Sequence, residues 1–229
     1  MINLRDFSYP KANPSLLACD QSKINEEATF AGINGANFIH IDIMDGKFVS
    51  NVSFSLEIAT SIERPSLNHP FIKDTHLMVV HPERVMSDYA KVSDIVTFHL
   101  EAGIDKENIL RCRDLIHESG ANAGLAINPN TDLEAIFPYL EEFDLILLMT
   151  VMPGKGGQPF DPNGYARIKR LKEEIMKTKK KPILEIDGGV NDKTSPLAKR
   201  SGAELLVAGS YLFGHEDFRE RLEGLEKND

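Results

Sequence analysis

The sequence has no tryptophan, only two cysteines and no long apolar run. Cys19 and Cys112 lie in unrelated contexts without a CxxC pair, so no disulfide framework is indicated and a reducing compartment is expected. No stretch reaches the roughly 18 apolar residues of a membrane-spanning helix. Residues 1–15 do not resemble a secretion signal, so the expected location is cytoplasmic.

An excess of positive charge is also missing. The 26 basic and 35 acidic residues give a formal net charge of −9. Such a chain repels nucleic acid and anionic lipid, so neither is an expected partner. The dense basic segment at residues 177–181 lies between a helical and a strand pattern, and we interpret it as a solvated helix end.

Strand and helix patterns alternate along the 229 residues. The expected strands span residues 13–19, 37–44, 71–79, 93–98, 121–127, 144–151, 182–187 and 203–208. The expected helices span residues 24–34, 54–62, 82–90, 106–119, 133–140, 163–177, 193–201 and 215–225. Most of these strands are apolar on both faces, which is typical of parallel strands covered by helices.

This alternation favours a (β/α)8 TIM barrel, an α/β fold, over a large doubly wound sheet. No GxGxxG segment follows the first strand, which argues against a dinucleotide-binding fold. The sequence has no long linker and no break in composition, so we expect residues 1–229 to form a single domain.

The densest chemical signal is the segment HIDIMDGKFVSN at residues 40–51. Alternation along a strand places His40, Asp42 and Met44 on one face, which would point into the barrel, and three isoleucines on the other. A histidine and a carboxylate two residues apart on a strand can bind one metal ion together. A buried histidine–aspartate hydrogen bond is the alternative interpretation of the pair alone.

Two further strand ends carry similar residues. His76 and Met78 share a face in DTHLMV, and Glu185 and Asp187 share a face in EIDGGVN. The combined set of two histidines and two carboxylates suits Zn²⁺, Fe²⁺, Mn²⁺ or Co²⁺ without selecting among them. This set comprises His40, Asp42, His76 and Asp187.

Glycine-containing loops follow the last three expected strands, in MPGKGGQPF, DGG and AGS. Glycine lets backbone N–H groups approach an anion closely, and phosphate sites recur after strands seven and eight of such barrels. We therefore expect a phosphate site. Met44, Met78 and Met149 near strand ends fit either flexible packing or a soft apolar lining of the site.

Seven segments occur in the order of a known motif set: PSLLACD, HIDIMDGKFVSN, THLMV, AINPNT, MTVMPGKGGQPF, EIDGGVN and GAELLVAGS. Over residues 13–213 the chain resembles the ribulose-phosphate 3-epimerases. The resemblance implies a (β/α)8 barrel that binds one divalent metal, forms a homo-oligomer, and interconverts D-ribulose 5-phosphate and D-xylulose 5-phosphate.

The resemblance also assigns roles to residues. The metal ligands correspond to His40, Asp42, His76 and Asp187, and the acid–base pair to Asp42 and Asp187. The implied substrate-binding residues are Ser15, His76, Met44, Met78, Met149, Gly154, Lys155, Gly156, Gly157, Gly188, Gly189, Gly209 and Ser210.

Three positions depart from the family pattern. Ser50 replaces a usual proline, Lys155 a usual phenylalanine and Ser55 a common glycine. Related allulose-6-phosphate 3-epimerases share HIDIMDG, a serine near Ser55 and GQPF, whereas DGGV is more similar to the ribulose-phosphate enzymes.

Epimerisation at C3 removes a proton beside the C2 ketone and returns one to the opposite face, so it needs two acid–base groups. In a closed ring, strands two and seven would present Asp42 and Asp187 from nearly opposing walls. A divalent metal would stabilise the enediolate charge. The alternatives are an allulose-6-phosphate 3-epimerase and a non-catalytic sugar-phosphate-binding barrel. No lysine at a strand end suggests a Schiff-base enzyme.

Overall fold

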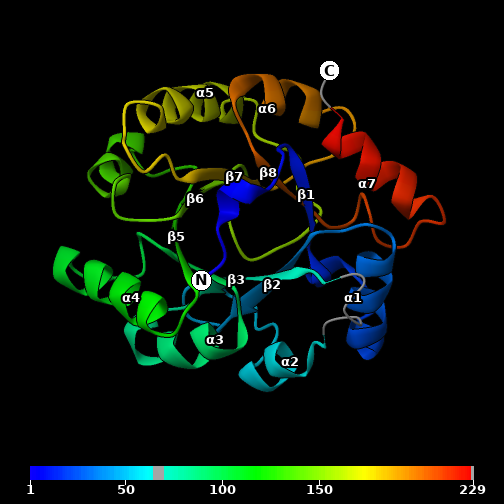
Figure 1. Ribbon diagram of the computed structural model, residues 1–229, viewed down its shortest axis with the longest axis horizontal. Helices are drawn as coiled ribbons and strands as arrows, with labels where there is room; N and C mark the ends of the chain where they lie inside the picture. Colours follow the sequence, from blue (N-terminus) through cyan, green and yellow to red (C-terminus); the bar gives the residue numbers. More distant parts are fainter. Residues whose placement is uncertain (64–69, 228–229) are drawn as a thin grey trace.

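The computed structural model describes residues 1–63 and 70–227. Eight parallel strands form a ring that helices surround (Figure 1). The strands are β1 (Lys11–Pro14), β2 (Phe38–Met44), β3 (Ile72–Met78), β4 (Ile95–His99), β5 (Asn122–Ile127), β6 (Leu145–Met149), β7 (Ile183–Asp187) and β8 (Leu205–Ala208). Their ladders run in the order β1-β8-β7-β6-β5-β4-β3-β2, and a parallel bridge between Ser15 and His40 joins the two ends. The predicted (β/α)8 barrel is confirmed.

The helices lie outside the ring. The α-helices are α1 (Ile24–Ile33), α2 (Leu56–Ser61), α3 (Met86–Val92), α4 (Lys106–Glu118), α5 (Gly164–Ile175), α6 (Ser195–Ser201) and α7 (Phe218–Glu226). The 3₁₀ helices are η1 (Leu4–Asp6), η2 (Leu16–Ala18), η3 (Gln21–Lys23), η4 (Pro82–Arg84) and η5 (Leu133–Tyr139). Among the described residues, no helix is both long and apolar enough to cross a bilayer.

The first strand ends earlier than predicted. The expected strand at residues 13–19 stops at Pro14, because the Ser15 hydroxyl accepts a hydrogen bond from the Leu17 amide at 3.3 Å and begins η2. This turn buries Leu16 in the core and brings Leu17 to the mouth of the barrel. The apolar run therefore has the composition of a strand but the geometry of a turn.

Two expected helices also differ in form. The helix expected at residues 133–140 is the 3₁₀ helix η5 (Leu133–Tyr139), which contains Pro138, a residue that cannot donate an α-helical hydrogen bond. Residues 82–90 divide into η4 and α3 at Val85, whose φ of −120° is outside the helical range.

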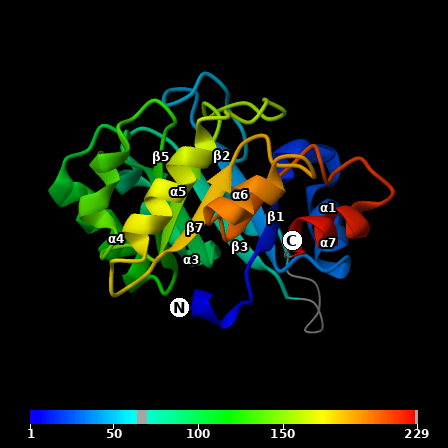
Figure 2. The same ribbon diagram turned by 90° about the horizontal axis from the view of Figure 1, so that it is seen from above.

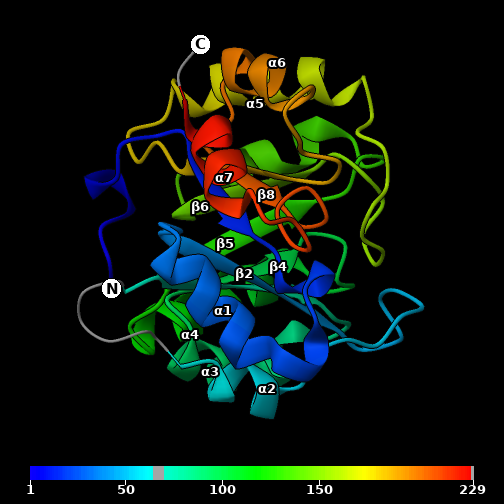
Figure 3. The ribbon, with the colours of Figure 1, turned by 90° about the vertical axis from the view of Figure 1, so that its right-hand side faces the viewer.

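Apolar side chains form two layers. Ile39, Ile41 and Ile43 of β2 belong to the large cluster between the strands and the helices, as the alternation predicted. A second cluster fills the barrel at the N-terminal ends of the strands, where Leu4 of η1 packs with residues such as Phe38. Figures 2 and 3 show the N-terminal segment at the opposite end from the loops that follow β2 and β6. The barrel is therefore plugged at one end and available for a ligand at the other.

Candidate active site

The strand register arranges the inward-facing polar side chains in two layers. In the ladder between β2 and β3, His40 pairs with Asp74, and Asp42 pairs with His76 one step higher. On β7, Glu185 lies in the lower layer and Asp187 in the upper one. Asp187 pairs with Met149 in the ladder between β7 and the neighbouring strand β6. The upper layer lies at the C-terminal ends of the strands, where barrels of this kind carry their functional groups.

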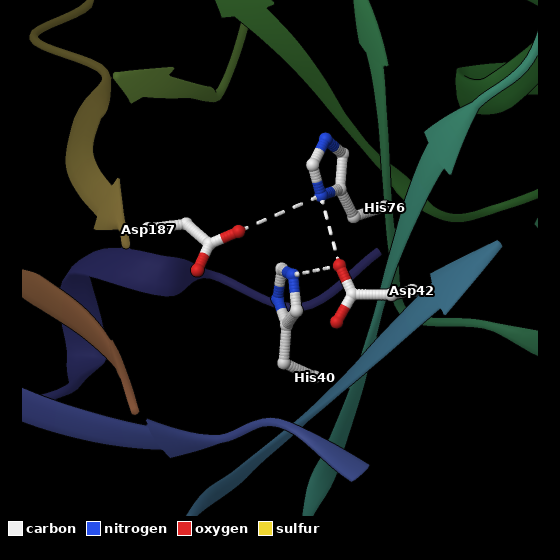
Figure 4. A group of neighbouring side chains, drawn as sticks. All are labelled: His40, Asp42, His76 and Asp187. Carbon is white, nitrogen blue, oxygen red and sulfur yellow. Dashed lines mark hydrogen bonds and ion pairs between the residues drawn. The ribbon is translucent and has the colours of Figure 1, made fainter. Parts of the chain in front are cut away.

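The four predicted metal ligands converge on one point. One ligand atom from each of them lies within 4.8 Å of the corresponding atoms of the others (Figure 4). His76 Nδ1 is 3.2 Å from Asp42 Oδ1 and 4.0 Å from Asp187 Oδ2, and His40 Nε2 is 3.3 Å from Asp42 Oδ1. The two histidines are completely buried.

The chemistry of this set fits a divalent cation. Among the described residues His40 Nε2 is buried without a hydrogen-bond partner, while His40 Nδ1 lies 2.7 Å from Asp74 Oδ2. A carboxylate behind one ring nitrogen leaves the other nitrogen free to ligate, which is the usual arrangement of metal-binding histidines. Two imidazoles and two carboxylates suit Zn²⁺, Fe²⁺, Mn²⁺ or Co²⁺.

The pKa values of the two upper carboxyls are displaced in opposite directions. Burial raises the pKa of Asp187 to about 7, and the charge of Asp42 adds to this effect. Burial opposes ionisation of Asp42 as well, but the neighbouring His40 and His76 outweigh it and hold the pKa of Asp42 below its usual range. The environments of the two carboxyls therefore separate their affinities for a proton.

The lower layer supports the upper one. Asn13 Nδ2 donates to Asp74 Oδ2 at 2.7 Å and to Glu185 Oε1 at 2.8 Å. Burial raises the pKa of Glu185 well above its usual value, and Asp74 adds to this effect. A protonated Glu185 beside Asp74 removes the repulsion that two buried carboxylates would otherwise have.

A cavity of about 840 Å³ opens above the upper layer, which contains Asp42 and Asp187. Asp42 and Asp187 reach it, and so do the implied substrate-binding residues other than His76, which is completely buried. These lining residues are Ser15, Met44, Met78, Met149, Gly154, Lys155, Gly156, Gly157, Gly188, Gly189, Gly209 and Ser210. The structure thus places the methionines and the three glycine loops around one space.

The loop after β7 requires glycine. Gly188 and Gly189 have φ values of +124° and +66°, which side chains of L-residues rarely adopt. A Cβ on Gly189 would lie 2.3 Å from the Phe160 amide nitrogen, and one on Gly188 would lie 2.8 Å from the Val151 nitrogen. The loops after β6 and β7 therefore pack backbone to backbone at the rim of the cavity.

The three departures from the family pattern lie in different environments. Lys155 is exposed and lines the cavity, whereas Ser50 is exposed in the loop after β2. Ser55 caps α2, since its side chain accepts a hydrogen bond from the Ile58 amide. The side chain of Asp45 accepts hydrogen bonds from the amides of residues 47, 48 and 80, which orders the loop after β2 without a proline.

Sequence reasoning missed several polar residues of the barrel interior. Asp74 and His99 are completely buried, and Glu101 follows the end of β4. Burial lowers the pKa of His99 to about 4. Strand parity could have identified Asp74, which lies two positions before His76. Arg221 of α7 also lines the cavity, and no local motif indicated it.

The fold and the position of this cavity define an α/β barrel whose functional groups gather at the C-terminal ends of its strands. The profile of the ribulose-phosphate 3 epimerase family matches residues 11–213. The chain therefore belongs to the ribulose-phosphate 3-epimerase family, whose members are isomerases.

Curated relatives cover nearly the whole chain. A ribulose-phosphate 3-epimerase of Bacillus subtilis is 40% identical over 90% of this chain and 94% of its own length. One of Escherichia coli is 34% identical over 90% of both chains. The solved structure of 3-keto-L-gulonate-6-phosphate decarboxylase from Vibrio cholerae shares the fold, with a TM-score of 0.70 at 12% identity over 95% of this chain and 96% of that one.

Proposed function

We propose that this protein interconverts D-ribulose 5-phosphate and D-xylulose 5-phosphate by moving the proton at C3. The observation that carries this proposal is the convergence of Asp42 from β2 and Asp187 from β7 on one cavity, with their pKa values displaced in opposite directions. Two carboxyls whose environments separate their pKa values are suited to opposite acid–base roles. Membership of the epimerase family supports the same reaction.

The two carboxyls would exchange a proton with opposite faces of the substrate carbon. The ionised Asp42 takes the C3 proton on one face, and the protonated Asp187 delivers a proton on the other. In the reverse direction the roles are exchanged. Ser15 Oγ donates a 2.8 Å hydrogen bond to Asp42 Oδ2, which holds that carboxylate in one orientation. Each positioned acid or base contributes on the order of 10²–10⁴-fold to the rate.

We further propose that His40, Asp42, His76 and Asp187 hold one divalent metal ion. When bound, it supplies Lewis-acid stabilisation of the negative charge that develops on the substrate oxygens. His40 and His76 project from β2 and β3 beneath the cavity, so the ion would lie at its floor. The donor set leaves Zn²⁺, Fe²⁺, Mn²⁺ and Co²⁺ as candidates.

The phosphate group would bind at the three glycine loops. Gly154, Gly156 and Gly157 follow β6, and the two other glycine loops follow β7 and β8 on the same rim. Lys155 adds a positive charge there that neutral backbone amides lack. Fixing the phosphate would orient C3 between the two carboxyls. Such orientation lowers a reaction barrier by several kcal/mol.

Proton NMR of ribulose 5-phosphate in D₂O tests the reaction, with and without a chelator. We expect loss of the C3 proton signal together with formation of xylulose 5-phosphate, and suppression of both after prolonged chelation. Exchange only with allulose 6-phosphate would instead support that sister activity. No exchange with either sugar in metal-loaded protein would support the non-catalytic alternative. Neither alternative is favoured by the relatives, which are named ribulose-phosphate 3-epimerases.

The Asp42→Asn variant tests the acid–base assignment. Turnover should fall by at least about 10²-fold because an amide cannot accept the C3 proton. Far-ultraviolet circular dichroism should be unchanged, and metal content should be measured in parallel because Asp42 is also a proposed ligand. Asp192→Asn, in the exposed segment after β7, is the matched control and should keep full turnover. Near-normal turnover of Asp42→Asn would contradict the assignment.

A homo-oligomeric assembly and a cytoplasmic location stay predictions from the sequence and the family. Sedimentation velocity of the purified protein would measure the assembly state directly.

A further inference from the structure

His76 is the first member of a hydrogen-bonded chain that leads away from the cavity. Its Nδ1 faces Asp42 and Asp187, and its Nε2 lies 2.8 Å from Nε2 of His99 on the neighbouring strand β4. His99 Nδ1 in turn lies 3.3 Å from Glu101 Oε2. Both imidazoles are completely buried, so bulk water does not compete for their ring nitrogens.

When His76 ligates a metal ion, this hydrogen-bonded chain admits one consistent placement of its protons. A metal ligand needs a lone pair on His76 Nδ1, so the proton of the neutral ring must be on Nε2. His76 Nε2–H then donates to His99 Nε2, which places the proton of His99 on Nδ1. That N–H donates to the carboxylate oxygen of Glu101, which can only accept.

The opposite placement excludes metal ligation at His76 and is unfavourable at Glu101. If His99 donated to His76, the proton of His76 would be on Nδ1, where it would donate to Asp42 Oδ1 at 3.2 Å and block ligation. His99 Nδ1 would then direct a lone pair at a carboxylate oxygen, and both atoms would be acceptors. The position of Glu101 therefore selects the tautomer of a histidine that it does not touch.

Other contacts fix the position of Glu101. Its Oε1 accepts hydrogen bonds from the Asn128 amide at 2.8 Å and from the Thr131 hydroxyl. Both residues belong to the AINPNT segment, which begins at the end of β5 and continues into the following loop, and for which the proposed reaction has no other role. The ring of Phe48 lies against His99 with a centroid separation of 4.7 Å, which restricts the orientation of the imidazole.

The two histidines of the metal set are thus supported in different ways. His40 has the carboxylate of Asp74 directly behind its Nδ1, at 2.7 Å. His76 has a carboxylate behind it through an intervening imidazole. Such partners orient ligating histidines and raise their basicity, and their removal typically lowers metal affinity by about 10–100-fold.

We propose that His99 and Glu101 are positioning residues that present Nδ1 of His76 to the divalent metal, and that the AINPNT segment holds Glu101 for this purpose. The inference rests on the proposed function in that His76 is taken as a metal ligand.

The Glu101→Gln variant replaces the acceptor at the end of the hydrogen-bonded chain His76–His99–Glu101 with a side chain that can donate to His99. The single amide oxygen of glutamine can accept from the segment at residues 128–131, and its NH₂ group then faces His99 Nδ1 as a donor. That donor favours a lone pair on His99 Nδ1, and so the tautomer in which His76 does not ligate. Side-chain volume is nearly unchanged.

Metal affinity is the first readout. Apo protein is titrated with Co²⁺ or Zn²⁺ against a chromophoric chelator, and we expect the dissociation constant of Glu101→Gln to rise about 10–100-fold. The visible absorption of the Co²⁺ form should shift, because the ligand field changes. Glu107→Gln, at an exposed position of the same βα unit, is the matched control and should leave both readouts unchanged.

The tautomers are the second readout. In wild-type Zn²⁺-loaded protein with ¹⁵N-labelled histidine, NMR should show His99 protonated at Nδ1 and His76 at Nε2. Thr131→Val removes one anchor of Glu101 but keeps its charge, so it should raise the dissociation constant less than Glu101→Gln does.

Three results would contradict the inference or its premise. A wild-type His99 protonated at Nε2 alone would overturn it, as would a dissociation constant of Glu101→Gln within about twofold of wild type. Both measurements are independent of whether C3 exchange occurs, so a failure of the proposed reaction is recognised separately. A wild-type protein that binds none of the candidate ions would overturn the metal site itself.

Discussion

At the residue scale, Gly189 shows how closely the rim of the cavity is packed. Its φ of +66° and the 2.3 Å separation between a hypothetical Cβ and the Phe160 nitrogen make any side chain at this position strained. Gly224 offers a contrast, because it lies in α7 with open space around it and an ordinary helical backbone. Identical substitutions at the two positions therefore have opposite consequences.

We expect Gly189→Ala to lower the free energy of unfolding by about 1–3 kcal/mol, the usual range for a strained backbone conformation. Because Gly189 lines the cavity, the KM for the sugar phosphate should rise as well. Gly224→Ala should leave KM unchanged and stabilise the protein by up to about 1 kcal/mol, since alanine favours a helix. Urea unfolding and steady-state kinetics measure both effects. Equal stability of the two variants would contradict the expectation.

The sequence predicted the site residues that lie in dense motifs better than the residues that support them from other parts of the fold. His40 and Asp42 share one strand face by parity alone, and the structure brings them together with His76 and Asp187. The contact between His76 and His99 depends on side-chain orientation across two strands, which parity does not specify. The role of Ser55 as a helix cap likewise became clear only once α2 was located.

At the element scale, Asp144 joins three parts of the barrel wall just before β6. Its Oδ2 accepts from the Ala123 amide at 2.8 Å and lies 2.7 Å from His117 Nε2 of α4. Lys180 Nζ, from the segment before β7, lies 3.0 Å from its Oδ1. Burial opposes ionisation, but these partners outweigh it and lower the pKa of Asp144.

We expect Asp144→Asn to destabilise the protein by about 1–3 kcal/mol at neutral pH. Folding lowers the pKa of this carboxylate. Its contribution to the free energy of unfolding is therefore complete above its unfolded pKa of about 3.9 and is lost as pH falls through its folded pKa. The difference between wild type and Asp144→Asn in urea unfolding should therefore shrink below about pH 4. The control Asp88→Asn, in an exposed part of α3, should show little difference at any pH. A difference in free energy of unfolding between wild type and Asp144→Asn that does not change with pH would contradict this prediction.

Strand positions were predictable because parallel strands buried on both faces appear as continuous apolar runs. The same rule misplaced the end of β1, since residues 16–18 are apolar but turn into η2. The distinction depends on the hydroxyl of Ser15 capping that turn, a local hydrogen bond that apolar patterning does not detect.

At the scale of the whole molecule, the two ends of the barrel serve different purposes. The end near the N-terminus is filled by the cluster that contains Leu4, which is 5% exposed, whereas the opposite end holds the cavity. Changes at the plugged end should therefore affect stability without changing the chemistry.

We expect Leu4→Ala to lower the free energy of unfolding by about 2–5 kcal/mol, as other buried leucine truncations do, with kcat unchanged. Leu197→Ala, the same truncation at a position of α6 that is 42% exposed, is the matched control and should cost much less stability. Chemical denaturation and the epimerisation assay measure the two quantities. A fall in kcat of more than about tenfold in fully folded Leu4→Ala protein would show that the plugged end influences the reaction.

The seam of the ring has a consequence for protein synthesis. The Ser15 amide donates to the carbonyl of Ala208, and the hydroxyl of the same residue holds Asp42, so the start of the chain is fixed against its last strand. A ribosome completes all four proposed metal ligands by residue 187, well before β8 emerges. A nascent chain thus possesses every proposed ligand while its first strand still lacks its ladder partner β8, and the cavity can close only after residue 208 has left the exit tunnel.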